Sequence, residues 1–173
     1  MMVRKLVLLI VILATLIGSM STASAANGQL MQKPLSGTVT QEFGPSHSGI
    51  DVAAASGTPV YATSDGVVMD TRIGSYRYDT GALGAGNYIV LRHCPGDLNQ
   101  SKKYCPKEDW TKYMHLKDVY VKIGQNVKRG QLIGSIGNTG NTTGITGNHL
   151  HFEIHENGRY GPAVNPRDYI RFG

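Results

Sequence analysis

The sequence lacks the features that would place it across a membrane or on a nucleic acid. Its longest apolar run, Leu6–Ile17, has 12 residues, whereas a helix that crosses a bilayer needs roughly 20. The formal net charge is only +5, and Lys and Arg are not gathered in one segment as they are in nucleic-acid-binding proteins. We therefore expect no nucleic-acid partner and no membrane-spanning helix of ordinary length.

The N-terminal apolar run is instead typical of an export signal. Arg4 and Lys5 precede it, and Ala23-Ser24-Ala25 follows it with the small-x-small pattern of a cleavage site. We predict a signal peptide over residues 1–25 that is cleaved after Ala25, and no membrane contact afterwards. The alternative is that the run is retained as a membrane anchor. No Cys lies near the cleavage site, so lipid attachment there is not expected.

Removal of this segment would leave residues 26–173, a length that suits one domain with one core. Since Arg4 and Lys5 are the only charged residues before position 26, the net charge would fall from +5 to +3. We predict an N-terminal tail over residues 26–35 and a single monomeric domain over residues 36–173. A mild positive charge is compatible with an anionic partner such as a cell wall.

Cysteine is scarce as well, and its two copies lie close together. Cys94 and Cys105 flank a short polar segment, and outside the cytoplasm such a pair favours a disulfide. Closing a loop of this size stabilises by about 3 kcal/mol in the chain-entropy model. Binding of zinc by two thiolates is the alternative, but the CxxC-like spacing typical of such sites is absent.

Helical periodicity is missing beyond a turn or two, whereas the chain has 22 glycines. Short alternating or β-branched segments recur instead, each bounded by Gly, Pro, Asn or Asp, which is typical of antiparallel strands. We therefore predict a mainly β, antiparallel, sandwich-like single domain with long loops. The predicted strand segments are 37–43, 58–72, 86–93, 110–116, 131–138 and 149–158.

Three of the six histidines fall within the last of these segments. His149 and His151 share one face of a strand and are roughly 6.6 Å apart along it, so both can reach one active centre. One of them would bind a metal, and the other would move protons or contact the substrate. His155 shares that face formally but lies roughly 13 Å from His151. We expect His155 to be a solvated residue at the strand end, with Glu153 between the two on the same face.

A catalytic zinc site usually needs a third protein ligand, and the segment GPSHSGID supplies candidates. His47 and Asp51 flank Gly49, which would let the backbone turn so that both side chains point inward. Alone, H-x-x-x-D is a weak pattern. His115, in YMHL, ends another predicted strand, and considered by itself it is better explained as a half-buried histidine with one hydrogen bond.

Taken together and in this order, these motifs resemble lysostaphin-type (LytM) zinc metalloendopeptidases, which hydrolyse peptidoglycan. The resemblance runs from about residue 36 to residue 169 and rests on three separated histidine motifs and the Gly-rich segments between them. The matching segments are HSGID, GTPVYATSDGVV, GNYIVLRH, YMHL, KRGQLIGSIGNTG and NHLHFEI…VNPRDYI.

The resemblance implies one zinc ion held by His47, Asp51 and His151, with His115 and His149 as an unligated catalytic pair. Two imidazoles and a carboxylate leave a coordination position open for water, whose pKa zinc lowers towards ~7. A neutral imidazole nearby can then accept a proton. Which of the two histidines is the base stays open.

His93 and the segment before His47 add no catalytic residue to this assignment. His93 matches a strand-end position without a catalytic role, so we expect it to be structural or solvated. Some family members carry a tyrosine shortly before H-x-x-x-D that stabilises the tetrahedral intermediate. Gln41 and Phe43 stand there in this chain, and Tyr113 or a loop tyrosine is a candidate replacement.

We therefore predict an exported zinc endopeptidase, periplasmic or in the cell wall, that hydrolyses peptidoglycan cross-bridges or stem peptides. A catalytically inactive module that binds the wall or activates another hydrolase is the first alternative, because the family includes such members. A lytic factor directed at other cells is the second. The sequence does not distinguish which peptidoglycan bond is cleaved.

Overall fold

The structure is a computed structural model that describes residues 31–74, 84–94, 108–142 and 147–173. The predicted signal peptide, residues 26–30 of the predicted tail, and Cys105 lie outside these ranges. The proposed pairing of Cys105 with Cys94 therefore stays a prediction, although Cys94 itself is described and buried at the end of a strand. Within the described ranges, no helix has the length and apolar character needed to span a membrane.

Strands form most of the regular structure in the described residues, which confirms the predicted fold class. A short 3₁₀ helix, η2 (Pro166–Asp168), lies near the C-terminal end. In chain order the strands are β1 (Thr38–Gln41), β2 (Ile50–Ala53), β3 (Pro59–Tyr61), β4 (Gly66–Arg72), β5 (Asn87–His93), β6 (Asp109–Val119), β7 (Asn126–Val127), β8 (Leu132–Ile136), β9 (His149–Glu156) and β10 (Ala163–Val164).

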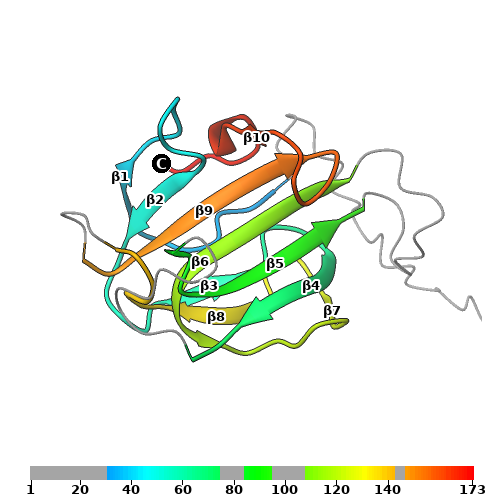
Figure 1. The fold of residues 1–173 in the computed structure, drawn as a ribbon, viewed down its shortest axis with the longest axis horizontal. Helices are drawn as coiled ribbons and strands as arrows, with labels where there is room; N and C mark the ends of the chain where they lie inside the picture. Colours follow the sequence, from blue (N-terminus) through cyan, green and yellow to red (C-terminus); the bar gives the residue numbers. More distant parts are fainter. Residues whose placement is uncertain (1–30, 75–83, 95–107, 143–146) are drawn as a thin grey trace, which may run out of the picture.

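The strands pair antiparallel in the order β1-β2-β9-β6-β5-β4-β7, while β10 pairs with β9, and β8 pairs with both β3 and β6. Figure 1 shows the long strands β9, β6, β5 and β4 side by side, with β3 and β8 behind them. The predicted segment 58–72 is split into β3 and β4, because the turn at Ser64-Asp65 interrupts it. Strand β2 occupies a stretch for which the sequence predicted a turn.

The faces of β9 separate the core from the candidate site. Leu150, Phe152 and Ile154 are fully buried in the hydrophobic core. The alternate residues from His149 to His155 face the other side of the strand, as the two-residue period of a strand requires. The predicted shared face of His149 and His151 is thus observed.

Strand β6 changes its partner at His115. Before this residue β6 pairs with β9, up to Met114 opposite His151, and after it β6 pairs with β8, from Leu116 opposite Ile136. The strand therefore does not end at His115, as the sequence predicted, but continues to Val119. One strand thus contributes to both layers, with His115 at the junction.

The described part of the predicted tail packs on the domain. Met31 and Leu35 are buried in the hydrophobic core. The amide of Gln32 donates to the carbonyl of Thr63, and the amide of Tyr61 donates to the carbonyl of Pro34. The packed part of the chain therefore begins no later than Met31, because two apolar side chains of this segment are buried in the core and its backbone bonds to Tyr61 and Thr63.

His93 is a structural residue inside the domain and not a solvated one. Its side chain is buried, its Nδ1–H donates to the carbonyl of Asp65 at 2.8 Å, and its Nε2 lies 2.8 Å from the hydroxyl of Thr111. Burial lowers the pKa of His93 to about 4, which outweighs the hydrogen bond to Asp65 and its negative charge. His93 is therefore neutral at pH 7.

This lowered pKa predicts a loss of stability in acid. The unfolded chain binds a proton at His93 below pH ~6.5, whereas the folded chain binds it only near pH 4, so the unfolding free energy falls between these values. The contribution of His93 to this fall should be about 3 kcal/mol. Urea unfolding of the wild type and His93→Gln between pH 7 and pH 4 measures it. The variant should be less stable at pH 7 and lose less stability on acidification, and an unchanged pH dependence would contradict this account.

Candidate metal centre and groove

Three potential metal ligands converge at one end of β2 and β9. Asp51 lies directly opposite His151 in the antiparallel register, and His47 comes from the loop before β2. The Asp51 Oδ1 atom is 2.8 Å from His151 Nδ1 and 3.2 Å from His47 Nε2. The two imidazole nitrogens are 3.1 Å apart. Among the described residues, these three side chains form the group whose ligand atoms lie close enough together to bind one metal ion.

Gly49 allows the loop and β2 to approach β9 this closely. A Cβ atom at this position would lie 2.3 Å from the carbonyl oxygen of Phe152 and 3.0 Å from Nε2 of His151. The sequence predicted that Gly49 lets His47 and Asp51 point inward, and both do so. The reason is the close contact with β9, because the φ angle of Gly49 does not lie in the left-handed region.

The outer nitrogen of each histidine in the trio is held by a hydrogen-bond acceptor. His47 Nδ1–H donates to the carbonyl of Glu42 at 2.9 Å, and His151 Nε2–H donates to Glu153 Oε1 at 3.1 Å. These bonds direct His47 Nε2 and His151 Nδ1 towards Asp51. Such outer hydrogen bonds are typical of histidines that bind metals, because they fix the ring and its tautomer.

The charges around His151 favour a cation at this place. Burial alone would lower the pKa of His151, but its hydrogen bonds to Asp51 and Glu153 and their negative charges raise it to about 9. Burial would likewise raise the pKa of Asp51, but the neighbouring histidines hold it below its ordinary value. The carboxylates of Asp51 and Glu153 therefore stabilise a positive charge between them, either a proton on His151 or a metal ion.

The trio fits zinc in both geometry and chemistry. Tetrahedral zinc with ligand distances of 2.0–2.2 Å separates its ligand atoms by about 3.3 Å, and the three observed separations are 2.8, 3.1 and 3.2 Å. Two imidazoles and one carboxylate match the donor sets of catalytic zinc sites, which leave a fourth position for water or substrate. A shift of a few tenths of an ångström would accommodate the ion.

His115 and His149 lie beside the trio. Their rings are 4.8 Å apart, and the ring of His115 is 6.2 Å from that of His151. His115 Nδ1–H donates to the carbonyl of Thr139 at 2.8 Å, and His149 Nδ1–H donates to the carbonyl of Gly147 at 3.1 Å. A carbonyl only accepts hydrogen bonds, so Nε2 is the atom of each neutral ring that can accept a proton.

The backbone of His115 is adjusted so that its side chain faces the site. Its φ is 61°, a left-handed conformation that costs a non-glycine residue about 1–3 kcal/mol. Consecutive strand residues normally face opposite sides, yet Met114 and His115 both line the groove described below. The amide of His115 still donates to the carbonyl of Ala85. The change of partner along β6 thus turns His115 towards His149.

Glu153 connects this centre to three other polar residues. Its Oε1 accepts from Ser48 Oγ at 2.5 Å as well as from His151, and its Oε2 lies 3.0 Å from Lys112 Nζ and 2.7 Å from His155 Nε2. Burial would raise the pKa of Glu153, but these hydrogen bonds and the charge of Lys112 hold it far below its ordinary range. Glu153 is therefore a carboxylate that fixes the outer side of His151.

The expectation that His155 is solvated is wrong. Its side chain is buried, and its Nδ1–H donates to the carbonyl of Gly161 at 2.8 Å. The strand does not end in solvent there, because the chain turns back after Glu156 and pairs β10 with β9, with Ala163 opposite His155. The two-residue spacing of His151, Glu153 and His155 was the sequence feature that could have indicated a connected row.

Tyr113 does not occupy the place of the missing family tyrosine. It is fully buried in the core, and its hydroxyl is bonded to the amide of Thr63 at 3.1 Å and to the hydroxyl of Thr111 at 3.2 Å. Burial raises its pKa despite these bonds. Neighbouring residues on β6 face opposite sides, so Tyr113 points into the core while Met114 faces the groove.

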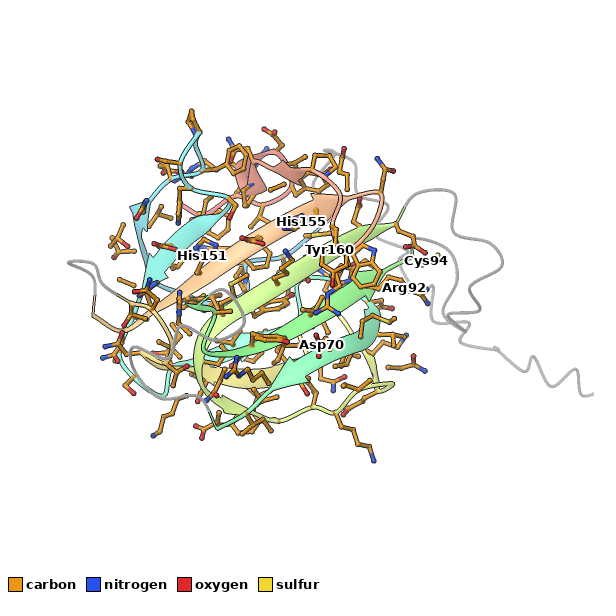
Figure 2. The ribbon with its side chains drawn as sticks, viewed as in Figure 1. Asp70, Arg92, Cys94, His151, His155 and Tyr160 are labelled. Carbon is orange, nitrogen blue, oxygen red and sulfur yellow. The ribbon has the colours of Figure 1, made fainter. Side chains whose placement is uncertain are left out.

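A groove with a volume of about 480 Å³ extends from this centre over the outer face of the sheet. The register places Asp70, Val90, Lys112 and Glu153 in one row across β4, β5, β6 and β9. Figure 2 shows His151 and His155 on β9, with Tyr160 over the neighbouring strands and Asp70 on β4. The residues that line the groove include Ser48, Ala85, Tyr88, Val90, Lys112, Met114, His115, His151, Glu153, Arg159 and Tyr160.

Sequence comparisons relate the chain to peptidases and to a hydrolase activator. The family model described as "Peptidase family M23" matches residues 45–166. The peptidoglycan DD-endopeptidase ShyA of Vibrio cholerae is 43% identical over 121 residues, which are 70% of this chain and 23% of that protein. The murein hydrolase activator NlpD of Salmonella typhimurium is 34% identical over 155 residues, which are 87% of this chain and 34% of that protein. The chain thus spans about a quarter to a third of the length of these two relatives.

Solved structures with the same fold include peptidases, one of which contains zinc. A zinc-containing peptidase from Vibrio cholerae superimposes with a TM-score of 0.57 at 33% identity, over 77% of this chain and 37% of that one. Lysostaphin from Staphylococcus simulans gives a TM-score of 0.54 at 29% identity, over 76% of this chain and 48% of that one. The mainly β architecture is therefore shared with both.

The support of His151 by Glu153 predicts the effect of a neutral replacement. Glu153→Gln should lower zinc affinity about 10- to 100-fold, because an amide removes the negative charge that orients His151 and favours a cation. Competition with a chromophoric chelator at pH 7.5 measures the affinity. The matched control is Glu108→Gln, since Glu108 pairs with Arg92 at 3.6 Å and contacts no member of the trio. Equal zinc affinity in Glu153→Gln and the wild type would contradict the proposed support.

Proposed function

The chain belongs to peptidase family M23, and from this premise we propose that it is a zinc endopeptidase that cleaves peptide bonds in peptidoglycan. Its relatives include a DD-endopeptidase and a murein hydrolase activator, which support a peptidoglycan hydrolase or an activator of one. The observation that favours the hydrolase is the complete set of five side chains. His47, Asp51 and His151 converge as candidate ligands. His115 lies beside them at the groove, and the ring of His149 is 4.8 Å from that of His115.

Each residue of this set has a defined task in the proposed reaction. Zinc, when bound, polarises the scissile carbonyl and lowers the pKa of the attacking water. His47, Asp51 and His151 would hold one ion per chain. Because Nδ1 of His115 and of His149 is engaged as a donor, Nε2 is the atom of each ring that would accept the proton in this reaction.

Only one of the two unligated histidines needs to receive the proton in a turnover. Burial, together with the proximity of His149 and His151, lowers the pKa of His115 to about 4 despite the hydrogen bond to Thr139, so His115 is neutral before the reaction. A second positive charge beside a first is unfavourable at a ring separation of 4.8 Å. The histidine that accepts the proton from water therefore becomes an N–H donor for the leaving amine. Its neighbour stays neutral, so only one of the two rings carries a positive charge.

The groove supports an extended substrate next to these groups. Val90 and Met114 give its floor apolar surface, while Lys112 and Arg159 add polar groups. Such a mixture suits a peptide whose side chains alternate in polarity. The cross-bridge or stem peptide of peptidoglycan is the substrate class that this groove and the family membership favour together.

We further propose that the protein is exported after loss of residues 1–25 and acts in the periplasm or the cell wall as a monomer. The predicted export signal, the peptidoglycan-acting relatives and the predicted Cys94–Cys105 disulfide all agree with a location outside the cytoplasm. In this proposal the catalytic domain comprises residues 36–173 together with the packed segment from Met31.

The test separates metal ligands from proton-transfer groups. His151→Ala and His47→Ala should lose both zinc and activity, because each removes a ligand. His115→Ala and His149→Ala should keep zinc and lose ~10²–10⁴-fold in turnover, the usual contribution of a general acid–base group. Zinc content is measured by mass spectrometry of the metal, and turnover by mass spectrometry of fragments released from purified peptidoglycan.

Two outcomes would contradict these assignments. If His115→Ala or His149→Ala loses zinc as completely as His47→Ala, that residue is a ligand. If the zinc-loaded wild type releases no fragments alone but accelerates an added peptidoglycan hydrolase, the activator function is correct and the hydrolase proposal fails.

A further inference from the structure

The hairpin between β9 and β10 presents an aromatic ring to solvent beside the groove. Tyr160 is 87% exposed, the highest value among the large apolar and aromatic side chains described as exposed, and it lines the groove together with Arg159. The amide of Gly161 donates to the carbonyl of Gly158, which closes a tight turn around Tyr160. Figure 2 shows the ring over the outer face of the sheet. Core packing does not account for a ring in this position.

Arg159 contacts this ring and is itself bonded to a carboxylate on another strand. The guanidinium carbon of Arg159 lies 5.4 Å from the centre of the Tyr160 ring, within the range of a cation–π contact. Arg159 forms an ion pair with Asp70 on β4, and the hydroxyl of Tyr88 on β5 donates to the same carboxylate at 3.0 Å. The ion pair between Arg159 and Asp70 thus connects the hairpin to β4 on the far side of the groove.

The register gives the distance between this rim and the metal centre. Asp70 lies three strands from Glu153 of β9 in this row, and neighbouring strands are about 4.8 Å apart, which gives roughly 14 Å. His151 lies two residues from Glu153 along β9, roughly 6.6 Å, so Asp70 and His151 are roughly 16 Å apart. An extended peptide covers 3.3–3.6 Å per residue, so about five residues fit between the reacting bond and Asp70. A group attached beyond that length would meet Tyr160 and its polar neighbours.

We propose that Tyr160, Arg159 and Asp70 bind a pyranose ring of the glycan strand that carries the peptide, an inference that rests on the proposed function. A pyranose has an apolar C–H face that can stack on an aromatic ring, and hydroxyls around its edge. The carboxylate of Asp70 accepts hydrogen bonds from such hydroxyls, and the guanidinium of Arg159 donates to them. Tyrosine and arginine are also the residue types that most often dominate recognition energies.

The local charges favour a neutral sugar over an anionic peptide group at this rim. Arg159 is paired with Asp70, and Lys112 is paired with Glu153, so the positive charges of the groove are balanced by neighbouring carboxylates. A peptide would also gain no backbone ladder here, since the groove floor is a sheet face and not an open strand edge. Stacking on Tyr160 requires neither a free charge nor a strand edge.

The test compares cross-linked peptide dimers with and without an attached disaccharide. For the zinc-loaded wild type, KM should be about 10-fold lower for the dimer that carries sugar. Tyr160→Ala should raise KM for that dimer to the value for the sugar-free dimer and leave kcat unchanged, whereas Tyr160→Phe should behave like the wild type. The matched control is Tyr120→Ala, because Tyr120 is 54% exposed and does not line the groove. Equal effects of Tyr160→Ala on both dimers would overturn the proposal.

A binding measurement separates this inference from the hydrolase proposal. An oligomer of N-acetylglucosamine is titrated into the wild type and Tyr160→Ala by calorimetry, which needs no turnover. Binding by the wild type that is at least 10-fold weaker in Tyr160→Ala supports the glycan site even if neither dimer is cleaved, in which case only the hydrolase proposal fails. Equal binding by both proteins, or no binding by the wild type, would overturn the glycan site.

Discussion

The pairing of β2 with β9 is the constraint on which the rest of the site depends. It places Asp51 opposite His151, and it is possible only because Gly49 has no side chain where the backbone meets Phe152. A shift of this pairing by one residue would turn Asp51 away from the histidines. The same strand face carries Glu153, so the register that forms the ligand trio also determines what supports it from outside.

A second constraint comes from β6, which belongs to both layers of the fold. Its change of partner requires a left-handed residue, and His115 takes that conformation with φ of 61°. The cost of this backbone conformation is offset by the ladders on both sides of His115, from Asp109 to Met114 with β9 and from Leu116 to Val119 with β8. The strained residue therefore carries the side chain that faces His149, which links the architecture directly to the proposed chemistry.

Much of this arrangement can be predicted from the sequence, because strand alternation is a local property. The spacing of His149 and His151 predicted their shared face, and the order of the motifs predicted the family and the fold. Features that depend on partners distant in sequence were not predictable in the same way. His155 is buried because the hairpin that leads to β10 covers it, and Met31 and Leu35 are buried although they stand in a polar segment, whose backbone bonds to Tyr61 and Thr63. In each case the burial is decided by a neighbour that the local pattern does not show.

The central claim is that two histidines and one aspartate hold the zinc while two further histidines stay unligated. X-ray absorption at the zinc edge of the metal-loaded protein tests this ligand set most directly. The account predicts two imidazole ligands and oxygen scatterers at 2.0–2.2 Å, from Asp51 and from solvent, and the same spectrum in His115→Ala and His149→Ala. A third imidazole that disappears in either variant, or a sulfur scatterer near 2.3 Å, would contradict it.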